Sequence, residues 1–208
     1  MSDLPKGWII DSISNTFELT RDKGLTGVTP YLEIGNININ NKKYSFTDKK
    51  SVKGCKKAIK GDVLISRVRP TRGAITQVKE KNLEVSSAFT ILRNTYGFNE
   101  RYLWYYLAWN NDYLNYLGSN CTGTMYPTVS ESMAVNYQVP IAPLNEQRRI
   151  VAKLEKLLHK VEACKERLDK IPAIIKRFHQ SVLAAACSGR LTSDWREQNP
   201  DSVPSSTL

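Results

Sequence analysis

Residues 145–188 read NEQRRIVAKLEKLLHKVEACKERLDKIPAIIKRFHQSVLAAACS. Apolar side chains recur in this stretch at alternating spacings of four and three residues, the heptad pattern of a helix that packs against another helix. The pattern predicts one long helix from Asn145 to Ser188, ended by Gly189 and kinked or broken at Pro172, which lacks a backbone donor. The residues expected to contact the partner helix are Ile150, Leu154, Leu157, Val161, Leu168, Ile171, Ile175, Phe178 and Val182.

A single amphipathic helix of 44 residues cannot bury its own apolar stripe, so this stretch needs a partner. The other helix that the sequence predicts, from Asn99 to Leu117, is much shorter and lies among predicted strands. We therefore expect a helical partner, either a second copy of the chain or another part of a longer protein. The alternative is a helix that folds back over the preceding residues.

The residues before 143 follow a different pattern, in which short apolar runs are separated by Gly, Pro and Asn. Val63–Val68 and Ala74–Val78 are predicted to form a hairpin through the turn at Arg69–Gly73. One helix is predicted between an N-cap at Asn99 and a terminating glycine at Gly118. Further strands are predicted at Tyr31–Ile34, Ser87–Leu92 and Val135–Val139.

These patterns together predict an α+β fold in three parts. Residues 1–143 form a strand-rich domain with one packed helix, residues 144–190 form a coiled-coil-forming helix, and residues 191–208 form a polar tail or linker. The chain has 208 residues, of which 41% are hydrophobic and 24% charged, close to the globular average, so wholesale disorder is excluded.

The sequence also indicates where in the cell the protein is located. No apolar run reaches the roughly 18 residues of a membrane span, and the opening residues, Met1–Trp8, lack a signal-peptide pattern. The four cysteines are far apart in the sequence and form no zinc-binding spacing with either histidine. We therefore expect a cytoplasmic protein with reduced thiols, no metal site and no membrane partner.

Positive charge is concentrated in one segment. Lys and Arg number 30 against 20 Asp and Glu, a net charge of +10. The segment from Lys42 to Lys81 holds 13 basic and three acidic residues, so it alone carries +10. A concentrated basic field is typical of a polyanion partner, most often nucleic acid. The alternative is a solvated lysine-rich surface.

The residue types divide the candidate DNA contacts into three groups. Lysine ammonium groups suit phosphates, which position a protein without specifying sequence, whereas arginine forks suit either phosphate or the guanine edge. A small polar loop with a glycine either approaches the DNA backbone closely or forms a tight turn. The predicted contacts are Lys42, Lys43, Lys49, Lys50, Lys53, Lys56 and Lys57, then Arg67, Arg69 and Arg72, then Thr122, Thr124 and Tyr126 of that loop.

The sequence offers little for catalysis. It contains neither a Gly-rich phosphate loop nor a GxSxG motif, and both histidines lie within the predicted heptad helix. Asp48-Lys49-Lys50 is a D-x-K fragment of the kind found in metal-dependent nucleases, but acidic residues produce such fragments by chance. We therefore predict no catalytic residue. A nuclease and a basic coiled-coil scaffold that binds nucleic acid without sequence specificity remain the alternatives to a sequence-specific reader.

Several segments, in this order, resemble the DNA-specificity subunit of type I restriction-modification systems. The resemblance covers nearly the whole chain, and its most specific part is the C-terminal run from Gln180 to Arg196. The other matching segments are Leu4–Trp8, Tyr31–Ile37, Lys60–Ser66, the Gly123-Thr124 loop and Val139–Gln147.

The resemblance implies a non-catalytic subunit that takes part in host defence. It implies that residues 1–143 are a target recognition domain, which reads one half of a split double-stranded DNA sequence, and that spacer helices pair antiparallel. It further implies a modification subunit that flips and methylates adenine with S-adenosylmethionine, and a restriction subunit that uses ATP and Mg. The chain itself is expected to need no cofactor.

The sequence departs from that family in one respect. It contains one recognition domain and one spacer helix, where the usual subunit has two of each. We expect either a natural half-subunit or the N-terminal half of a longer protein. If the chain is a fragment, self-pairing through the helix, as a homodimer, would substitute for the missing half.

Overall fold

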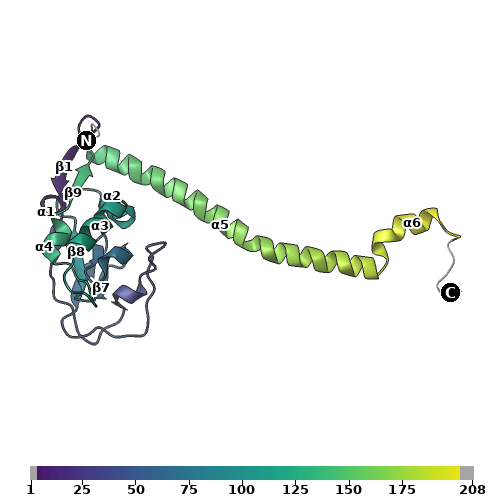
Figure 1. The fold of residues 1–208 in the computed structure, drawn as a ribbon, viewed down its shortest axis with the longest axis horizontal. Coiled ribbons are helices and arrows are strands. Elements are labelled where there is room, and N and C mark those ends of the chain that lie inside the picture. Colours follow the sequence, from purple (N-terminus) through teal and green to yellow (C-terminus); the bar gives the residue numbers. More distant parts are fainter. Residues whose placement is uncertain (1–3, 202–208) are drawn as a thin grey trace. The chain divides into compact units, whose positions relative to one another are not determined.

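The computed structural model describes residues 4–201, and the chain divides into two units, one ending at Lys153 and the next beginning at Leu154. The first unit mixes strands and helices, as predicted (Figure 1). The strands are β1 (Ile9–Ser12), β2 (Glu18–Thr20), β3 (Tyr31–Leu32), β4 (Lys56–Ile59), β5 (Val63–Ser66), β6 (Ile75–Gln77), β7 (Asn82–Val85), β8 (Phe89–Arg93) and β9 (Gln138–Ile141). The α-helices are α1 (Ile13–Thr16), α2 (Glu100–Trp109), α3 (Asn111–Ser119), α4 (Glu131–Val135), α5 (Leu144–Cys187) and α6 (Ser193–Gln198).

Strand β5 lies inside a four-stranded sheet with the order β2-β8-β5-β6, in which the strands pair antiparallel. All four of its residues, Val63 to Ser66, are buried. Because successive side chains of a strand point to opposite faces, a continuous buried run needs cover on both sides. Val63 and Ile65 belong to one apolar cluster, whereas Leu64 belongs to the other.

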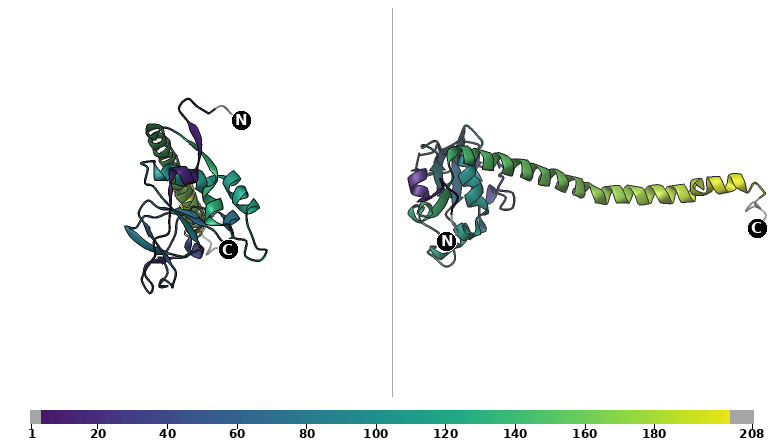
Figure 2. Two further views of the ribbon diagram at one scale, coloured as in Figure 1. Left: turned by 90° about the vertical axis from the view of Figure 1, so that its left-hand side faces the viewer. Right: turned by 90° about the horizontal axis from the view of Figure 1, so that it is seen from above.

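The two clusters place different elements on the two faces of this sheet. The cluster that contains Val63 also holds Leu107 of α2 and Leu117 of α3, so these helices cover one face (Figure 2). The cluster that contains Leu64 holds Leu32 and Leu83 of the three-stranded sheet β3-β7-β4, which covers the other face. A third sheet pairs β1 antiparallel with β9 and brings the two ends of the domain together.

The predicted hairpin is confirmed, but several boundaries differ. β5 pairs antiparallel with β6 across the predicted turn. The strand predicted at Tyr31–Ile34 is shorter, because a 3-10 turn, η1 (Ile34–Asn36), takes over after Leu32. The strand predicted at Val135–Val139 is displaced to Gln138–Ile141 and includes Pro140, which is tolerated because β9 is paired with β1 alone.

The single helix predicted from Asn99 to Gly118 is two helices. Asn99 caps the first of them as predicted, since its side chain accepts hydrogen bonds from the backbone of Arg101 and Tyr102. Asn110 then leaves the helical conformation, at φ −88° and ψ 108°, and its side chain caps α3 in the same way. Gly118 lies inside α3 rather than after it. A second asparagine cap therefore divides a stretch whose apolar spacing reads as continuous.

Helix α5 is confirmed as one long element from Leu144 to Cys187, so Pro172 does not break it; the ribbon bends partway along, as the alternative prediction of a kink requires (Figure 1). The side chains around Pro172 are exposed, so water can reach the carbonyl group of Leu168, which lacks its usual donor. Gly189 ends the helical run in the left-handed conformation, at φ 69°, as predicted. The predicted polar tail is helical over α6, which follows a 3-10 turn, η3 (Arg190–Thr192); residues 202–208 lie outside the described part.

A buried ion pair joins β8 to the start of β5. The Asp62 carboxylate, with a side chain only 2% exposed, accepts hydrogen bonds from Arg93 Nε at 3.1 Å and from Arg93 Nη2 at 2.9 Å. It also accepts from the backbone of Ile59 at 2.9 Å. Asp22, which is half-exposed, binds the same guanidinium through Nη1 at 2.6 Å. The Asp62 carboxylate is therefore a buried acceptor for both the mostly buried Arg93 guanidinium and the Ile59 amide.

We predict that Asp62→Ala lowers the free energy of unfolding by about 3–5 kcal/mol, because it leaves the Arg93 charge and the Ile59 amide without their buried acceptor. Denaturant titration followed by tryptophan fluorescence measures this change. Asp22→Ala removes the exposed carboxylate from the same guanidinium and serves as the matched control, with a much smaller expected loss. Equal losses in the two variants would contradict the assignment of the buried pair.

Candidate nucleic-acid interface

A groove of about 660 Å³ opens beside the turn that connects β5 to β6. One wall comes from η1 and the turn after it, and the other comes from Val68, Arg69 and Arg72 around the 3-10 turn η2 (Pro70–Arg72). Tyr126 also lines the groove, from a loop more than 50 residues further along the chain. The structure therefore brings together three of the predicted DNA contacts, two arginines and one tyrosine.

The loop that carries Tyr126 is a short hairpin. The backbone amide of Thr122 donates to the carbonyl of Thr128 at 2.8 Å, and the reverse hydrogen bond is 2.9 Å long. Thr128 also forms a bridge with Val68. We call this element the Thr122–Thr128 hairpin. Its pairing with the segment after β5 explains how a polar loop distant in sequence reaches the groove, and it favours the tight-turn interpretation of that loop.

Arg69 has a backbone conformation that is rare for a residue with a side chain, at φ 47° and ψ 53°. Its amide donates to the carbonyl of Pro127 at 2.8 Å, which holds the backbone against the Thr122–Thr128 hairpin. Its guanidinium lies 5.1 Å from the centre of the Tyr126 ring, within the range of a cation–π contact. The arginine is thus oriented before any ligand binds.

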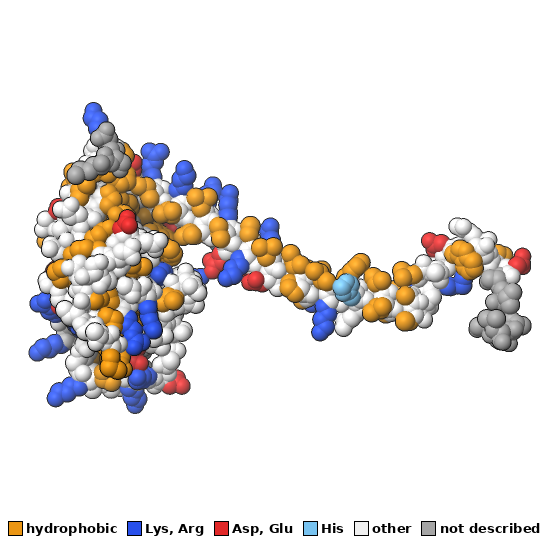
Figure 3. Space-filling view, viewed as in Figure 1, with side chains coloured by type: hydrophobic (Ala, Val, Ile, Leu, Met, Phe, Trp, Pro, Cys, Tyr) orange, Lys and Arg blue, Asp and Glu red, His pale blue; other side chains and the backbone are white. Residues whose placement is uncertain are grey.

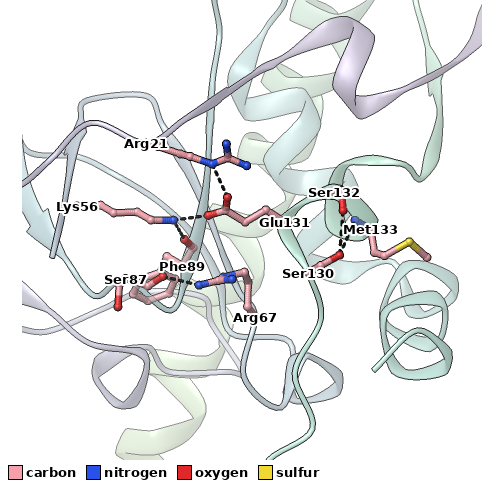
Figure 4. Close-up of polar contacts among 9 residues, drawn as sticks. All are labelled: Arg21, Lys56, Arg67, Ser87, Phe89, Ser130, Glu131, Ser132 and Met133. Carbon is pink, nitrogen blue, oxygen red and sulfur yellow. Dashed lines mark hydrogen bonds and ion pairs between the residues drawn. The ribbon is translucent and has the colours of Figure 1, made fainter. Parts of the chain in front are cut away.

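Arg67 points elsewhere. Its Nη2 donates to the carbonyl of Ser87 at 2.8 Å (Figure 4). Its Nε is buried and has no acceptor within residues 4–201. Arg67 does not line the groove, so the structure separates it from Arg69 and Arg72, with which the sequence analysis grouped it.

Lys42 does not face solvent, and this corrects its assignment as a phosphate contact. The residue is buried, and its ammonium donates to the carbonyl of Gly73 at 2.7 Å. It lies 6.0 Å from the centre of the Trp109 ring. Burial lowers the pKa of the Lys42 ammonium below its ordinary 10.5. Lys42 links the loop on one side of the groove to the turn on the other.

Lys56 is also part of the fold rather than of a free surface. Its ammonium donates to the carbonyl of Phe89 at 2.8 Å and forms an ion pair with Glu131 (Figure 4). Arg21 Nε lies 2.7 Å from the other oxygen of the same carboxylate. Burial alone would raise the pKa of Glu131, but the hydrogen bonds from Lys56 and Arg21 outweigh it and hold the pKa below its ordinary 4.5.

The remaining predicted contacts lie at the surface. Lys49 is paired with Glu33 at 2.8 Å, and Lys57 is half-buried on β4. The exposed members are Lys43, Lys50, Lys53, Arg72, Thr122 and Thr124. The groove residues that were not predicted include Asn38, Ile39 and Asn40, whose only signal is an asparagine-rich stretch that is equally typical of an ordinary turn.

The described residues hold no group of three or more His, Cys, Asp or Glu side chains arranged for a metal ion. Both histidines lie on α5, and Asp48 is exposed in a loop. Within residues 4–201, no helix is long and apolar enough to cross a membrane.

The Glu131 cluster gives a pH-dependent prediction. Because the folded-state pKa of Glu131 lies below 4.5, its stabilising contribution is present above that pH and is lost as the pH falls through the lower, folded-state value. We expect Glu131→Gln to lower the free energy of unfolding by about 2 kcal/mol at neutral pH, and this gap to shrink below pH 4.5. Urea titrations at several pH values measure both quantities.

Asp48→Asn, which changes an exposed carboxylate on a loop, is the control and should match the wild type. A gap between Glu131→Gln and the wild type that does not change with pH would argue against the ion pair as its source.

The comparisons with known proteins agree with this architecture. The family model described as "Type I restriction modification DNA specificity domain" matches residues 10–173. The EcoKI specificity subunit of Escherichia coli K12 is 29% identical over 219 residues, covering 95% of this chain and 46% of that protein. The StySPI specificity subunit of Salmonella potsdam is 30% identical over 218 residues, covering 94% of this chain and 46% of that protein.

Solved structures show the same similarity. A chain from a study of complex assembly and conformational transition of the type I restriction-modification system has a TM-score of 0.70 at 25% identity, covering 89% of this chain and 51% of that one. The HsdS subunit of Thermoanaerobacter tengcongensis has a TM-score of 0.64 at 28% identity, covering 77% of this chain and 44% of that one. The chain thus spans about half the length of these relatives. It belongs to the family of type I restriction-modification DNA specificity domains.

Proposed function

We propose that this chain is a sequence-specific DNA recognition subunit, or half-subunit, of a type I restriction-modification complex. The observation that carries the proposal is the groove in which Arg69, Arg72 and Tyr126 meet, on a domain of the DNA-specificity family. Arginine forks can read guanine edges, and exposed lysines such as Lys50 and Lys53 can neutralise phosphates. The family match supports neither of the two alternatives, a nuclease and a non-specific scaffold.

The chemistry on DNA belongs, in this proposal, to partner subunits. A modification subunit would methylate adenine with S-adenosylmethionine, and a restriction subunit would use ATP and Mg. The specificity chain would bind duplex DNA and position both. Its cytoplasmic location stays a prediction.

Selection from a random duplex pool tests the recognition function. We expect the intact chain to enrich one half-site motif, and we expect the cognate modification subunit, once added, to methylate adenines next to that same motif. The chain alone, with Mg, ATP and S-adenosylmethionine, should leave DNA unchanged. Retention of all duplexes alike would favour the non-specific scaffold, and Mg-dependent cutting by the pure chain would favour the nuclease.

The apolar stripe of α5 supports helix pairing. Among its predicted pairing residues, the seven from Leu157 to Val182 are 37–64% exposed, and Figure 3 shows apolar side chains along the helix. Ile150 and Leu154, near the start, are partly covered. Full burial of one large aliphatic side chain stabilises by roughly 1.5–3 kcal/mol, so pairing of the whole stripe would be strongly favourable.

We propose that α5 pairs antiparallel, with a second copy or with the other half of a longer subunit. The helix begins where the recognition domain ends, so an antiparallel pair would carry one recognition domain at each end of the spacer. Two halves of a split DNA target could then be bound together. A parallel pair would place both recognition domains at one end.

We predict that Leu157→Asp combined with Leu168→Asp abolishes self-association and methylation at paired half-sites, because it places charges in the apolar seam. Ala152→Asp combined with Ala173→Asp is the matched control, since both alanines are exposed at outward heptad positions. Sedimentation velocity and methylation of two-half-site duplexes measure the effects. Equal effects of the two double variants would contradict pairing through this stripe. Cross-links that join residue 150 of one copy only to residue 150 of the second copy would contradict the antiparallel orientation.

A further inference from the structure

The tip of the Thr122–Thr128 hairpin exposes apolar side chains. Met125 is 80% exposed, the highest value for a large apolar side chain within residues 4–201, and Tyr126 is 65% exposed. Met125 does not line the groove and is not among the DNA contacts predicted from the sequence. An exposed apolar side chain lacks the stabilisation that burial would provide. An apolar tip beside a candidate binding surface therefore points to a ligand that covers it.

The hairpin holds this tip in a defined position. Reciprocal backbone hydrogen bonds join Thr122 to Thr128, and Thr128 is also bridged to Val68. Gly123 turns the tip with φ +86°, and a Cβ atom there would lie 3.2 Å from the carbonyl oxygen of Tyr126. The tip is therefore anchored to the segment that follows β5, and its glycine is needed for the turn.

The side chains around the tip indicate which class of ligand would bind there. The Arg69 guanidinium lies over the Tyr126 ring, and Arg72 lies in the same groove, so positive charge borders the apolar tip. A duplex offers the complement of this surface, with phosphates flanking apolar base faces. Methionine is among the side chains that DNA-bending proteins insert between base steps, where they unstack the bases and kink the duplex.

We propose that Met125 acts as a wedge that enters the base stack of the bound duplex. In this arrangement the Arg69–Tyr126 pair lies against the DNA beside the unstacked step, and the Thr122–Thr128 hairpin supplies the rigid support. The inference rests on the proposed DNA-recognition function and adds a mode of binding to it. It also predicts that part of the sequence preference comes from how easily one base step deforms.

The test uses the intact chain and duplexes that it has selected from a random pool. Fluorophores at the two ends report bending, and 2-aminopurine at successive positions reports unstacking. The wild type should kink the duplex by roughly 20–90° and raise the 2-aminopurine signal at one step. Met125→Ala should lose both signals and bind up to about tenfold more weakly. Met125→Leu should restore both, because leucine is also an effective wedge.

Leu25→Ala is the matched control, because Leu25 is a 66% exposed apolar residue in a different loop and should have no effect on either signal. If Met125→Ala kinks and unstacks the duplex as much as the wild type does, the proposal that Met125 is a wedge is wrong. Tight binding by the wild type without kinking or unstacking would also overturn it, while leaving the recognition function intact. Failure of the wild type to select any duplex would overturn both. Weaker association of Met125→Ala with the modification subunit, at unchanged DNA bending, would instead assign the tip to a protein contact.

Discussion

The burial of β5 on both faces is the constraint on which the recognition domain depends. Its four residues are buried, it pairs with β8 and β6, and its three apolar residues, Val63 to Ile65, contribute alternately to two apolar clusters. The residues that follow must leave this core at once, because arginines cannot remain in it without partners. The turn that carries Arg69 and Arg72 therefore follows directly from the buried strand, and the Thr122–Thr128 hairpin pairs with the same segment.

Local energetics divide the basic residues into two groups. Lys42 and Lys56 are drawn into the fold, where a carbonyl group or a carboxylate replaces the water that each ammonium has lost. Arg69 remains at the groove because a planar guanidinium can lie against an aromatic ring while it keeps donors for a ligand. Net charge therefore overstates the number of cations at the surface that a ligand can reach.

Helix α5 differs from the preceding domain because it leaves its apolar side chains exposed. Its apolar residues from Leu157 onward are exposed along a helix with no second long helix among the described residues. The recognition domain buries its apolar surface internally, whereas the spacer helix leaves a stripe whose burial requires another helix. The proposed functions of recognition and assembly thus lie in separate stretches of the chain.

Elements with local signals could be predicted from the amino-acid sequence. The heptad spacing predicted α5 nearly to the residue, the continuous apolar run predicted β5 and its hairpin with β6, and Asn99 marked the start of α2. The family resemblance, too, could be read from ordered short motifs. These features depend on periodicity and on side chains that cap their own helix, so neighbouring residues carry the information.

Which charged residues are exposed, and where the loops meet, depends instead on contacts between distant parts of the chain. The burial of Lys42 depends on Gly73 and Trp109, and the pairing of Arg69 with Tyr126 joins residues 57 positions apart. The break at Asn110 and the continuity through Pro172 likewise depend on competing caps and on exposure. Such contacts depend on where the chain returns in space, so neither composition nor spacing could have located the groove or the apolar tip beside it.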